Sequence, residues 1–454
     1  MRFSRSQQLL ARVRTGGHLT SGEQARLALL LALPAIISQL VTIVMEYLDT
    51  AMVGHLGAAA SASIGIVSTT TWLMGGLCSS LAGGFAVLVA QSIGAQDMRR
   101  ARIVLRKAVR FTLLTSTAIG AAGAAISPWL PQWLGGGPEI QHDATVYFFV
   151  FAVSIPVWEL NFLMAGMLRS AGNTLMPSVV NVAACLLDVA FNYVFIFVLR
   201  MGVAGAALGT LCAMGISATA LTVYTLCFSP ELHLTGTGKE TTEADGTIVR
   251  EALQIGVPMA VQHVAMCSAH IVSTVIVAPL GTTAIAAHAF GITIEGLCYM
   301  PGYGIGDAAT TLAGQTIGAR RADLQRSFAR ITLGLGVGFM TFMGMLMYAG
   351  VPWLMPLMTP DAAVQALTVE CLRIEAFAEP LYAASIVAYS LFVGAGDTRV
   401  PAALNLGSMW VVRLPLAWLL AQSIGLRGVW AAMCAELCFR GIIFVIRLYK
   451  KKAI

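Results

Sequence analysis

The sequence predicts an all-α, polytopic membrane protein with twelve transmembrane helices in two parallel-repeat six-helix bundles. Three observations support this fold class. Apolar residues make up 57% of the 454 residues and charged residues only 11%, whereas a soluble domain carries about 25% charged residues. Long apolar runs recur along the whole chain, and the two halves repeat the same residues at one fixed offset. Lipid is therefore the expected solvent of this chain.

The apolar runs predict the helices one by one. In hydrocarbon every backbone N–H and C=O must be paired inside the protein, so a run long enough to cross a bilayer is expected to be helical. In the first half the predicted spans are 27–52, 62–90, 111–131, 146–168, 178–200 and 204–228. In the second half they are 256–279, 287–313, 331–354, 373–394, 403–423 and 428–447.

Polar stretches divide the chain into four predicted parts. Residues 1–26 form a cytoplasmic N-terminal segment, residues 27–228 the first six-helix bundle and residues 251–454 the second. The stretch 229–250 is the long hydrophilic segment between them and is the predicted cytoplasmic linker. The stretch from Thr20 to Glu23 matches a capping box, so we expect a helix to begin there.

The distribution of Lys and Arg predicts the orientation in the membrane. Cytoplasmic loops carry an excess of basic residues, and a cytoplasmic N-terminus places most of them inside. The protein is then a multi-pass protein of the cell's inner (plasma) membrane with both termini in the cytoplasm. The inner segments hold Arg99, Arg100, Arg102, Arg106, Lys107, Arg110, Arg320, Arg321, Arg326, Arg330, Arg447, Lys450, Lys451 and Lys452, and the outer ones only Arg200, Arg373 and Arg427.

The two halves match at an offset of 224 residues over about 150 positions. The even number of spans per repeat starts both halves on the same side of the membrane, which makes them parallel repeats. Two such bundles enclose a central cleft that opens to each side in turn when they rock, which indicates a transporter. The matching pairs are Pro34 and Pro258, Pro156 and Pro380, Asn181 and Asn405, residues 91–95 and 315–319, and residues 171–174 and 395–398.

Polar side chains inside the first half form the candidate ion-coupling and substrate site. Asp49 lies near the outer end of the first span, and Asp188 and Asn192 lie one turn apart on the fifth. Thr210 lies about two turns into the sixth span, so all four are expected in the outer half of the bundle. Their oxygen atoms suit a proton, or a sodium ion held at Asp49 and Asp188. Ionisable groups inside a membrane are costly and usually functional.

Each of these residues also has a purely structural interpretation. Asp49 can be a helix-end acid that faces headgroup water, and Asp188 can be a buried acid bonded to neighbouring helices. Asn192 and Thr210 can simply link helices, as such groups often do in membranes.

Weaker candidates complete the predicted set. Glu46 lies one turn from Asp49 and can share its site, and Asn181 is a polar residue of the fifth span. Glu375 and Glu379 lie one turn apart on the tenth span and can either bind a cationic substrate or pair with Arg413. Further predictions are a structural ion pair between Glu436 and Arg440, packed polar side chains at His263 and His270, unassigned roles for Glu295 and Asp307, and Ser273 where the repeat would match Asp49.

With these residues in place, the chain resembles the multidrug and toxic compound extrusion (MATE) family over about residues 27–447. Each motif alone is weak, but the ordered and doubled set is specific. The motifs are Pro34, Asp49, Val53-Gly54, Leu56-Gly57 and residues 91–95, 168–174 and 202–207 in the first half, and Gly256-Val257-Pro258 and residues 315–319 and 394–398 in the second.

The resemblance implies a secondary active antiporter that exports organic, often cationic or amphiphilic compounds in exchange for protons or sodium. The chain looks closer to the DinF-like branch, whose aspartate on the first span matches Asp49. Members of the NorM-like branch carry an acid on the seventh span, where this chain has Met266. DinF-like members have an asparagine followed by an aspartate on the fifth span. Here the order is swapped, with Asp188 before Asn192.

Other functions remain as alternatives at this point. A flippase for a lipid-linked precursor needs a basic cavity for pyrophosphate, and only Arg413 and Arg440 lie within spans. A membrane enzyme needs a catalytic cluster, and the sequence has no nucleophile–base set, metal motif or phosphate loop. We therefore expect no enzymatic activity, no cofactor beyond the coupling ion, and no nucleic-acid partner. The expected partners are small organic substrates, the ion and membrane lipids, and the expected state is a monomer.

Overall fold

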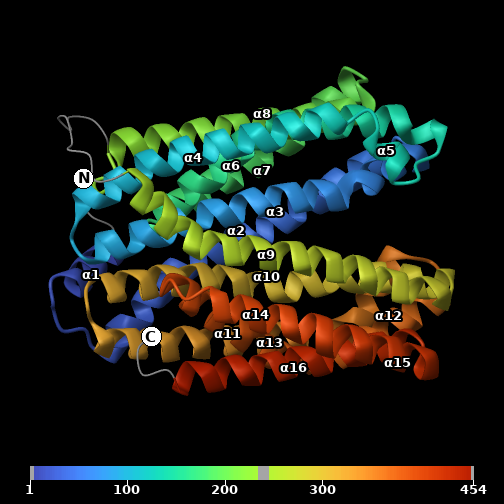
Figure 1. Ribbon diagram of the computed structural model, residues 1–454. Coiled ribbons are helices and arrows are strands. Elements are labelled where there is room, and N and C mark those ends of the chain that lie inside the picture. Colours follow the sequence, from blue (N-terminus) through green and yellow to red (C-terminus); the bar gives the residue numbers. More distant parts are fainter. Residues whose placement is uncertain (1–4, 234–244, 451–454) are drawn as a thin grey trace. The chain divides into compact units, whose positions relative to one another are not determined.

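The computed structural model describes residues 5–233 and 245–450 (Figure 1), which contain helices and turns and no β-strand. In the first half the helices are α1 (Arg5–Arg14), α2 (Ser21–Gly54), α3 (Ala58–Gly94), α4 (Met98–Ile126), α5 (Leu130–Trp133), α6 (Pro138–Ser170), α7 (Leu175–Tyr193) with the π-helical turn η1 (Val194–Val198), and α8 (Gly202–Val223) with η2 (Tyr224–Phe228). In the second half they are α9 (Asp245–Val277) with the 3₁₀ turn η3 (Ala278–Leu280), α10 (Thr282–Gly318), α11 (Ala322–Met358), α12 (Ala362–Glu375), α13 (Glu379–Gly394), α14 (Arg399–Gly407), η4 (Ser408–Arg413), α15 (Leu414–Ile424) and α16 (Leu426–Lys450).

Each predicted apolar span falls on one helix or on consecutive helical segments of the structure, which confirms the fold class. Among the described residues, 10 helices are individually long and apolar enough to cross a membrane, and the pair α12 and α13 raises the number to 11. The predicted span 287–313 falls on α10, a helix of 37 residues whose polar side chains include Glu295 and Asp307.

The helices do not begin and end where the predicted spans do. The helices extend past the apolar runs: α4 begins at Met98, so the basic residues from Arg99 to Arg110 lie on a helix rather than in a loop. Lys and Arg are good helix formers, so a helix continues where the apolar run stops. The helix α9 begins at Asp245, inside the stretch predicted as the linker, and residues 234–244 of that stretch lie outside the described part. The predicted continuous span 373–394 is bent by 57° between α12 and α13.

The chain packs into two compact units whose limits lie inside helices. Unit 1 comprises residues 1–40 and 264–454, and unit 2 comprises residues 41–263. The limits therefore fall within α2 and α9, so unit 2 holds the end of α2, helices α3 to α8 and the beginning of α9. The predicted division into bundles at 27–228 and 251–454 stays a prediction.

Close helix contacts in unit 2 depend on glycine. The helices α3, α4, α6 and α8 lie side by side, as Figure 1 shows. A Cβ on Gly84 would lie 2.1 Å from the Ala252 carbonyl oxygen, and one on Gly120 would lie 2.5 Å from the Ala152 carbonyl oxygen. Small residues let helix backbones approach in this way in membranes, where dispersion contacts replace the hydrophobic effect between helices.

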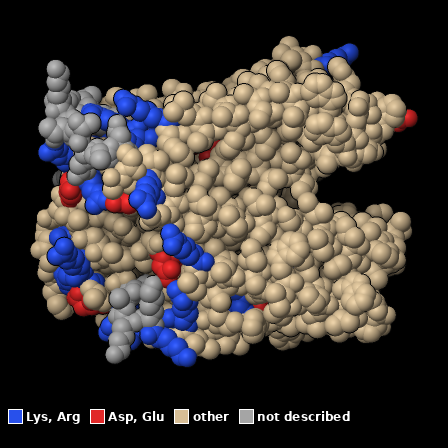
Figure 2. All heavy atoms as spheres, in the orientation of Figure 1, with Lys and Arg blue, Asp and Glu red and all other residues tan. Residues whose placement is uncertain are grey.

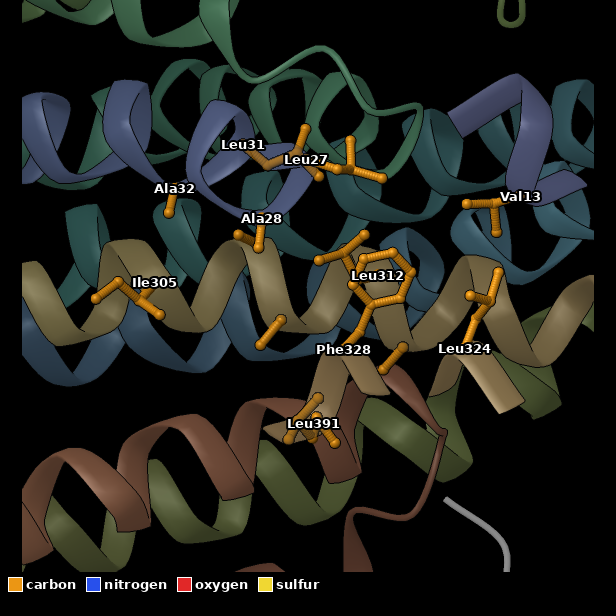
Figure 3. Close-up of a cluster of buried hydrophobic side chains, with 14 of the residues drawn as sticks. Val13, Leu27, Ala28, Leu31, Ala32, Ile305, Leu312, Leu324, Phe328 and Leu391 are labelled. Carbon is orange, nitrogen blue, oxygen red and sulfur yellow. The ribbon is translucent and has the colours of Figure 1, made fainter. Parts of the chain in front are cut away.

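Residues of α1 are part of the core of unit 1, which the sequence did not predict, and the cytoplasmic placement of residues 1–26 stays a prediction. Figure 3 shows Val13 of α1 and Leu27 and Leu31 of α2 in the cluster that contains Leu312 and Phe328. The α1 helix is amphipathic, so it is polar on average but buries one apolar face.

The predicted capping box at the start of α2 is confirmed. The Thr20 backbone N–H donates to Glu23 Oε2 at 2.9 Å, and the Glu23 backbone N–H donates to Thr20 Oγ1 at 3.3 Å. These reciprocal bonds satisfy two backbone donors at the beginning of the helix.

Basic side chains gather at one end of the helices within each unit (Figure 2). In unit 2 they belong to the first turns of α4, and in unit 1 to the beginning of α11 and the end of α16. Asp397 and Arg447 form an ion pair of 2.6 Å at this end of unit 1.

Candidate functional site

In unit 2 the asparagine of α7 joins two carboxyl groups from different helices. The Asn192 side-chain amide donates to Asp49 Oδ1 at 2.9 Å and to Asp188 Oδ2 at 3.1 Å. Asp188 and Asn192 are almost fully buried, with 0% and 1% of their surfaces exposed, and Asp49 is half-buried. The structure thus brings together the predicted residues of the first and fifth spans.

The Asn192 amide holds the two carboxyl groups close to each other, because it donates to both of them. The fourth predicted residue, Thr210, follows Gly209 on α8, and its hydroxyl donates to the Ala206 carbonyl oxygen at 3.2 Å. A Cβ on Gly209 would meet Asn192, so this turn of α8 lies against the same side chains. We call Asp49, Asp188, Asn192 and Thr210 the Asp49 site.

A glycine of α8 creates the space for the Asn192 amide. A Cβ on Gly209 would lie 2.0 Å from Asn192 Oδ1 and 3.0 Å from the Asn192 backbone nitrogen. Only a residue without a side chain therefore allows α7 and α8 to approach this closely. Gly209 was not among the residues predicted from the sequence, although its place beside Thr210 in a predicted span was a usable signal.

Two oxygen atoms of the Asp49 site have no hydrogen-bond partner among the described residues. They are Asp188 Oδ1 and Asn192 Oδ1, and both are buried. Buried polar atoms are rarely left unpaired, so such atoms need an explanation. The described residues contain no group of three or more His, Cys, Asp and Glu side chains that could hold a metal ion.

The weaker candidates of this half lie around the Asp49 site rather than in it. Glu46 is exposed on the surface of α2. The Asn181 side-chain amide donates to Thr42 Oγ1 at 3.0 Å, which links α7 to α2. Tyr147 of α6 packs against the apolar cluster that includes Val53.

Unit 1 contains a second group of buried charges around Glu436 of α16. Arg413 Nε donates to Glu436 Oε2 at 2.9 Å, and Arg413 Nη2 lies 2.7 Å from the same oxygen. Arg440 Nε lies 3.3 Å from Glu436 Oε1, which places the predicted ion pair in the structure, although without hydrogen-bond geometry. The Arg440 guanidinium also lies over the Tyr382 ring, 5.5 Å from its centroid.

The predicted pair Glu375 and Glu379 flanks the bend between α12 and α13. Each side chain is 1% exposed, and none of its carboxyl oxygens has a hydrogen-bond partner among the described residues. Arg413 bonds to Glu436 rather than to either of them. Glu295 of α10 is also buried, and it lies close enough for its charge to interact with those of Glu375 and Glu379.

The two histidines of α9 differ in exposure, because His270 is exposed, against the prediction of a packed side chain, whereas His263 is half-buried. His263 belongs to unit 2, where its ring lies against Gly76 and its Nε2 is 3.1 Å from the Trp72 carbonyl oxygen. This contact agrees with the prediction of a packed polar side chain.

Comparison with known proteins identifies the family. The family model MatE matches residues 34–194 and 258–419. The chain is 25% identical over 437 residues to a probable multidrug resistance protein NorM of Thermotoga maritima, covering 93% of each protein. It is also 25% identical to human multidrug and toxin extrusion protein 1, covering 95% of this chain and 76% of the human one.

Solved structures show the same fold. A crystal structure of a MATE protein in complex with MaL6 matches with a TM-score of 0.90 at 19% identity and covers 99% of both chains. The bent form of the Vibrio cholerae MATE transporter VcmN matches with a TM-score of 0.86 at 18% identity, covering 95% of this chain and 97% of the other. Because the family model covers both halves of the sequence, the chain belongs to the MATE family of multidrug efflux transporters and is not an enzyme.

Proposed function

We propose that this chain is a secondary active antiporter that exports small organic compounds, often cationic or amphiphilic, in exchange for protons or sodium ions. In this proposal two six-helix bundles, 27–228 and 251–454, alternate access to a central substrate site. The chain acts as a monomer in the inner membrane with both termini in the cytoplasm. The relatives named for multidrug resistance and for multidrug and toxin extrusion support an organic substrate. The assignment to the DinF-like branch stays a prediction.

The contact of Asp49 with Asp188 through Asn192 carries this proposal. Two carboxylates this close repel each other, and inside the described part of the chain neither forms an ion pair with Lys or Arg. A mobile cation, either a proton or sodium, is therefore needed to neutralise the site. Binding of that cation drives transport if the two conformations of the transporter differ in their affinity for it.

The bend between α12 and α13 supports a role for Glu375 and Glu379 in binding cationic substrates. Interrupted helices mark substrate and ion sites in many transporters, because backbone groups freed at the break face the site. Both glutamates are buried without a hydrogen-bond partner among the described residues. A cationic group of the substrate would supply the missing partner.

The alternative function, a flippase for a lipid-linked precursor, is less well supported. Such a protein needs basic side chains that are available to bind pyrophosphate. Arg413 and Arg440 are the basic residues that lie away from the ends of the predicted spans, and both lie against Glu436. Their guanidinium groups are thus already occupied by a carboxylate.

Efflux in everted membrane vesicles tests the proposed role of Asp49. We expect Asp49→Asn to abolish efflux of a cationic dye under a proton gradient and under a sodium gradient applied separately, because the variant cannot bind the coupling ion in the same way. Glu139→Gln is the matched control, since Glu139 is an exposed acid in the first turn of α6 in the same unit. Full gradient-driven efflux by Asp49→Asn would overturn the assignment.

A further inference from the structure

A third buried acid of unit 2, Glu159 of α6, lies outside the Asp49 site. Only 2% of its surface is exposed. The Ser79 hydroxyl of α3 donates to Glu159 Oε1 at 2.9 Å. The other oxygen, Oε2, is buried and has no hydrogen-bond partner among the described residues.

The helices around Glu159 offer it no fixed cation. The sequences of α3 and α8 contain no Asp, Glu, Lys, Arg or His, and the nearest titratable group on α3 is the Cys78 thiol. On α4 the last basic residue is Arg110, which is exposed, and on α9 His263 lies against Gly76 and the Trp72 carbonyl. The other charges of α6 lie at its ends, at Glu139, His142, Asp143 and Arg169.

This environment requires a neutral side chain. An ionised carboxylate without a partner costs several kcal/mol in a protein interior, and a protonated carboxyl does not carry that cost. Since the Ser79 hydroxyl occupies Oε1, the proton is carried by Oε2. In this conformation Glu159 therefore holds a proton of its own.

The α6 helix joins Glu159 to the Asp49 site. Tyr147, which packs against the cluster beside that site, lies twelve residues before Glu159 on the same helix. This separation corresponds to roughly 18 Å along an α-helix. Between them stands Pro156, which has no N–H to bond to the Ala152 carbonyl and so weakens the helix at this point.

We propose that Glu159 is a second proton-binding site of unit 2, separate from Asp49 and Asp188, which takes up and releases a proton during transport. It lies toward the end of α6 that carries Arg169. This inference rests on the proposed function, with the proton as coupling ion. Protonation of Glu159 neutralises the charge between α3 and α6, and loss of the proton leaves a carboxylate that disfavours this closed packing.

Infrared difference spectroscopy of the purified full-length protein in lipid nanodiscs tests the proposal. Wild-type spectra recorded between acidic and alkaline buffer should contain separate C=O stretching bands for Glu159 and for the Asp49 site, besides any bands of the buried acids of unit 1. We expect Glu159→Gln to lose one band and Asp49→Asn to lose the other. A Glu159→Gln spectrum identical to that of the wild type would overturn the proposal.

Ser79→Ala provides an independent variant, because it keeps the carboxyl group and removes its hydroxyl donor. The band lost in Glu159→Gln should shift in Ser79→Ala, and this shift decides the matter if Glu159→Gln does not fold. An unshifted band would count against the site.

Proton-driven efflux separates this inference from the proposed function. Glu159→Gln should flatten the pH dependence of efflux while dye binding persists. A pH profile equal to that of the wild type would show that the group is only structural. If Asp49→Asn kept its efflux, the proposed function would be overturned. The infrared band of Glu159 would still decide whether this side chain binds a proton.

Discussion

In unit 1 the buried Glu436 lies against the guanidinium groups of Arg413 and Arg440, whereas in unit 2 Asp49, Asp188 and Glu159 form no ion pair among the described residues. The two units contain matched repeats, with Pro156 and Pro380 at equivalent positions. The two repeats therefore share matched positions along the chain, but these buried acids are neutralised in different ways.

The difference indicates separate tasks for the two units. A fixed guanidinium neutralises a carboxylate permanently, so the charge state of Glu436 does not depend on a diffusing ion. Acids without such a partner need a mobile cation, and their site responds to the ion gradient. In unit 2 that cation is the proposed coupling ion, and at Glu375 and Glu379 of unit 1, which also have no hydrogen-bond partner among the described residues, it is the proposed cationic substrate. The fourth helices of the two repeats also differ from each other. The α6 helix continues through Pro156, whereas α12 and α13 are bent by 57° before Pro380.

Removing the fixed cation of unit 1 should have the largest effect on stability. Arg413→Met leaves Glu436 with Arg440 alone, which contacts it at 3.3 Å without hydrogen-bond geometry. Breaking a buried ion pair by removing one partner costs about 3–5 kcal/mol. The measurement is the fraction of monodisperse protein that survives heating in detergent.

Arg440→Met is the matched control for this prediction. It removes the more weakly placed guanidinium, so its loss of thermal stability should be clearly smaller. Equal stability of Arg413→Met and the wild type would show that unit 1 does not depend on a fixed cation and would remove the contrast between the units.

Closing the space beside Asn192 should have an intermediate effect. A Cβ on Gly209 would lie 2.0 Å from Asn192 Oδ1, so Gly209→Ala must displace the amide that joins the two aspartates. Overpacking of this kind costs about 1–3 kcal/mol, which corresponds to a factor of roughly 5 to 150 in an equilibrium constant. We expect gradient-driven efflux to fall by a similar factor.

Gly215→Ala tests whether any alanine in α8 has the same effect. No heavy atom lies within 4 Å of a Cβ built on Gly215, so this change should leave efflux intact. Alanine is also the better helix former, by up to about 1 kcal/mol. If the two variants behaved alike, the close approach of α7 and α8 would not be what positions Asn192.

Much of the fold could be predicted from hydropathy and the repeat, because apolar runs must be helical in lipid. The grouping of Asp188 with Asn192 follows from their spacing of one turn. The ion pair between Arg413 and Glu436 could not be predicted in the same way, since it joins two helices and depends on tertiary packing. The buried face of α1 was missed because its polar residues dominate the average.

Other features required coordinates for a different reason. The bend before Glu379 lies in an apolar run without glycine, and Pro380 alone does not distinguish a bent helix from a continuous one, as Pro156 shows. Glu159 is one acid among several in predicted spans. Its isolation becomes visible only when the neighbouring helices are known to lack charges.

Asn181→Ala should have the smallest effect and would define the limit of the Asp49 site. The Asn181 amide donates to Thr42 Oγ1 at 3.0 Å, whereas the amide that joins Asp49 to Asp188 is that of Asn192. Loss of one such hydrogen bond costs about 1 kcal/mol. We therefore expect slightly lower thermal stability and efflux within about twofold of the wild type, as is usual for hydrogen bonds that merely link transmembrane helices.

A double-mutant cycle with Thr42→Val gives this prediction its control. If the pair acts only as a link between α2 and α7, each single change should cause nearly the same loss of stability, and the double change should add little to it. Abolition of efflux by Asn181→Ala, with Thr42→Val unaffected, would instead place Asn181 in the ion path. The Asp49 site would then extend along α7 toward its first turns, and unit 2 would hold its coupling ion with more than the aspartates, Asn192 and Thr210.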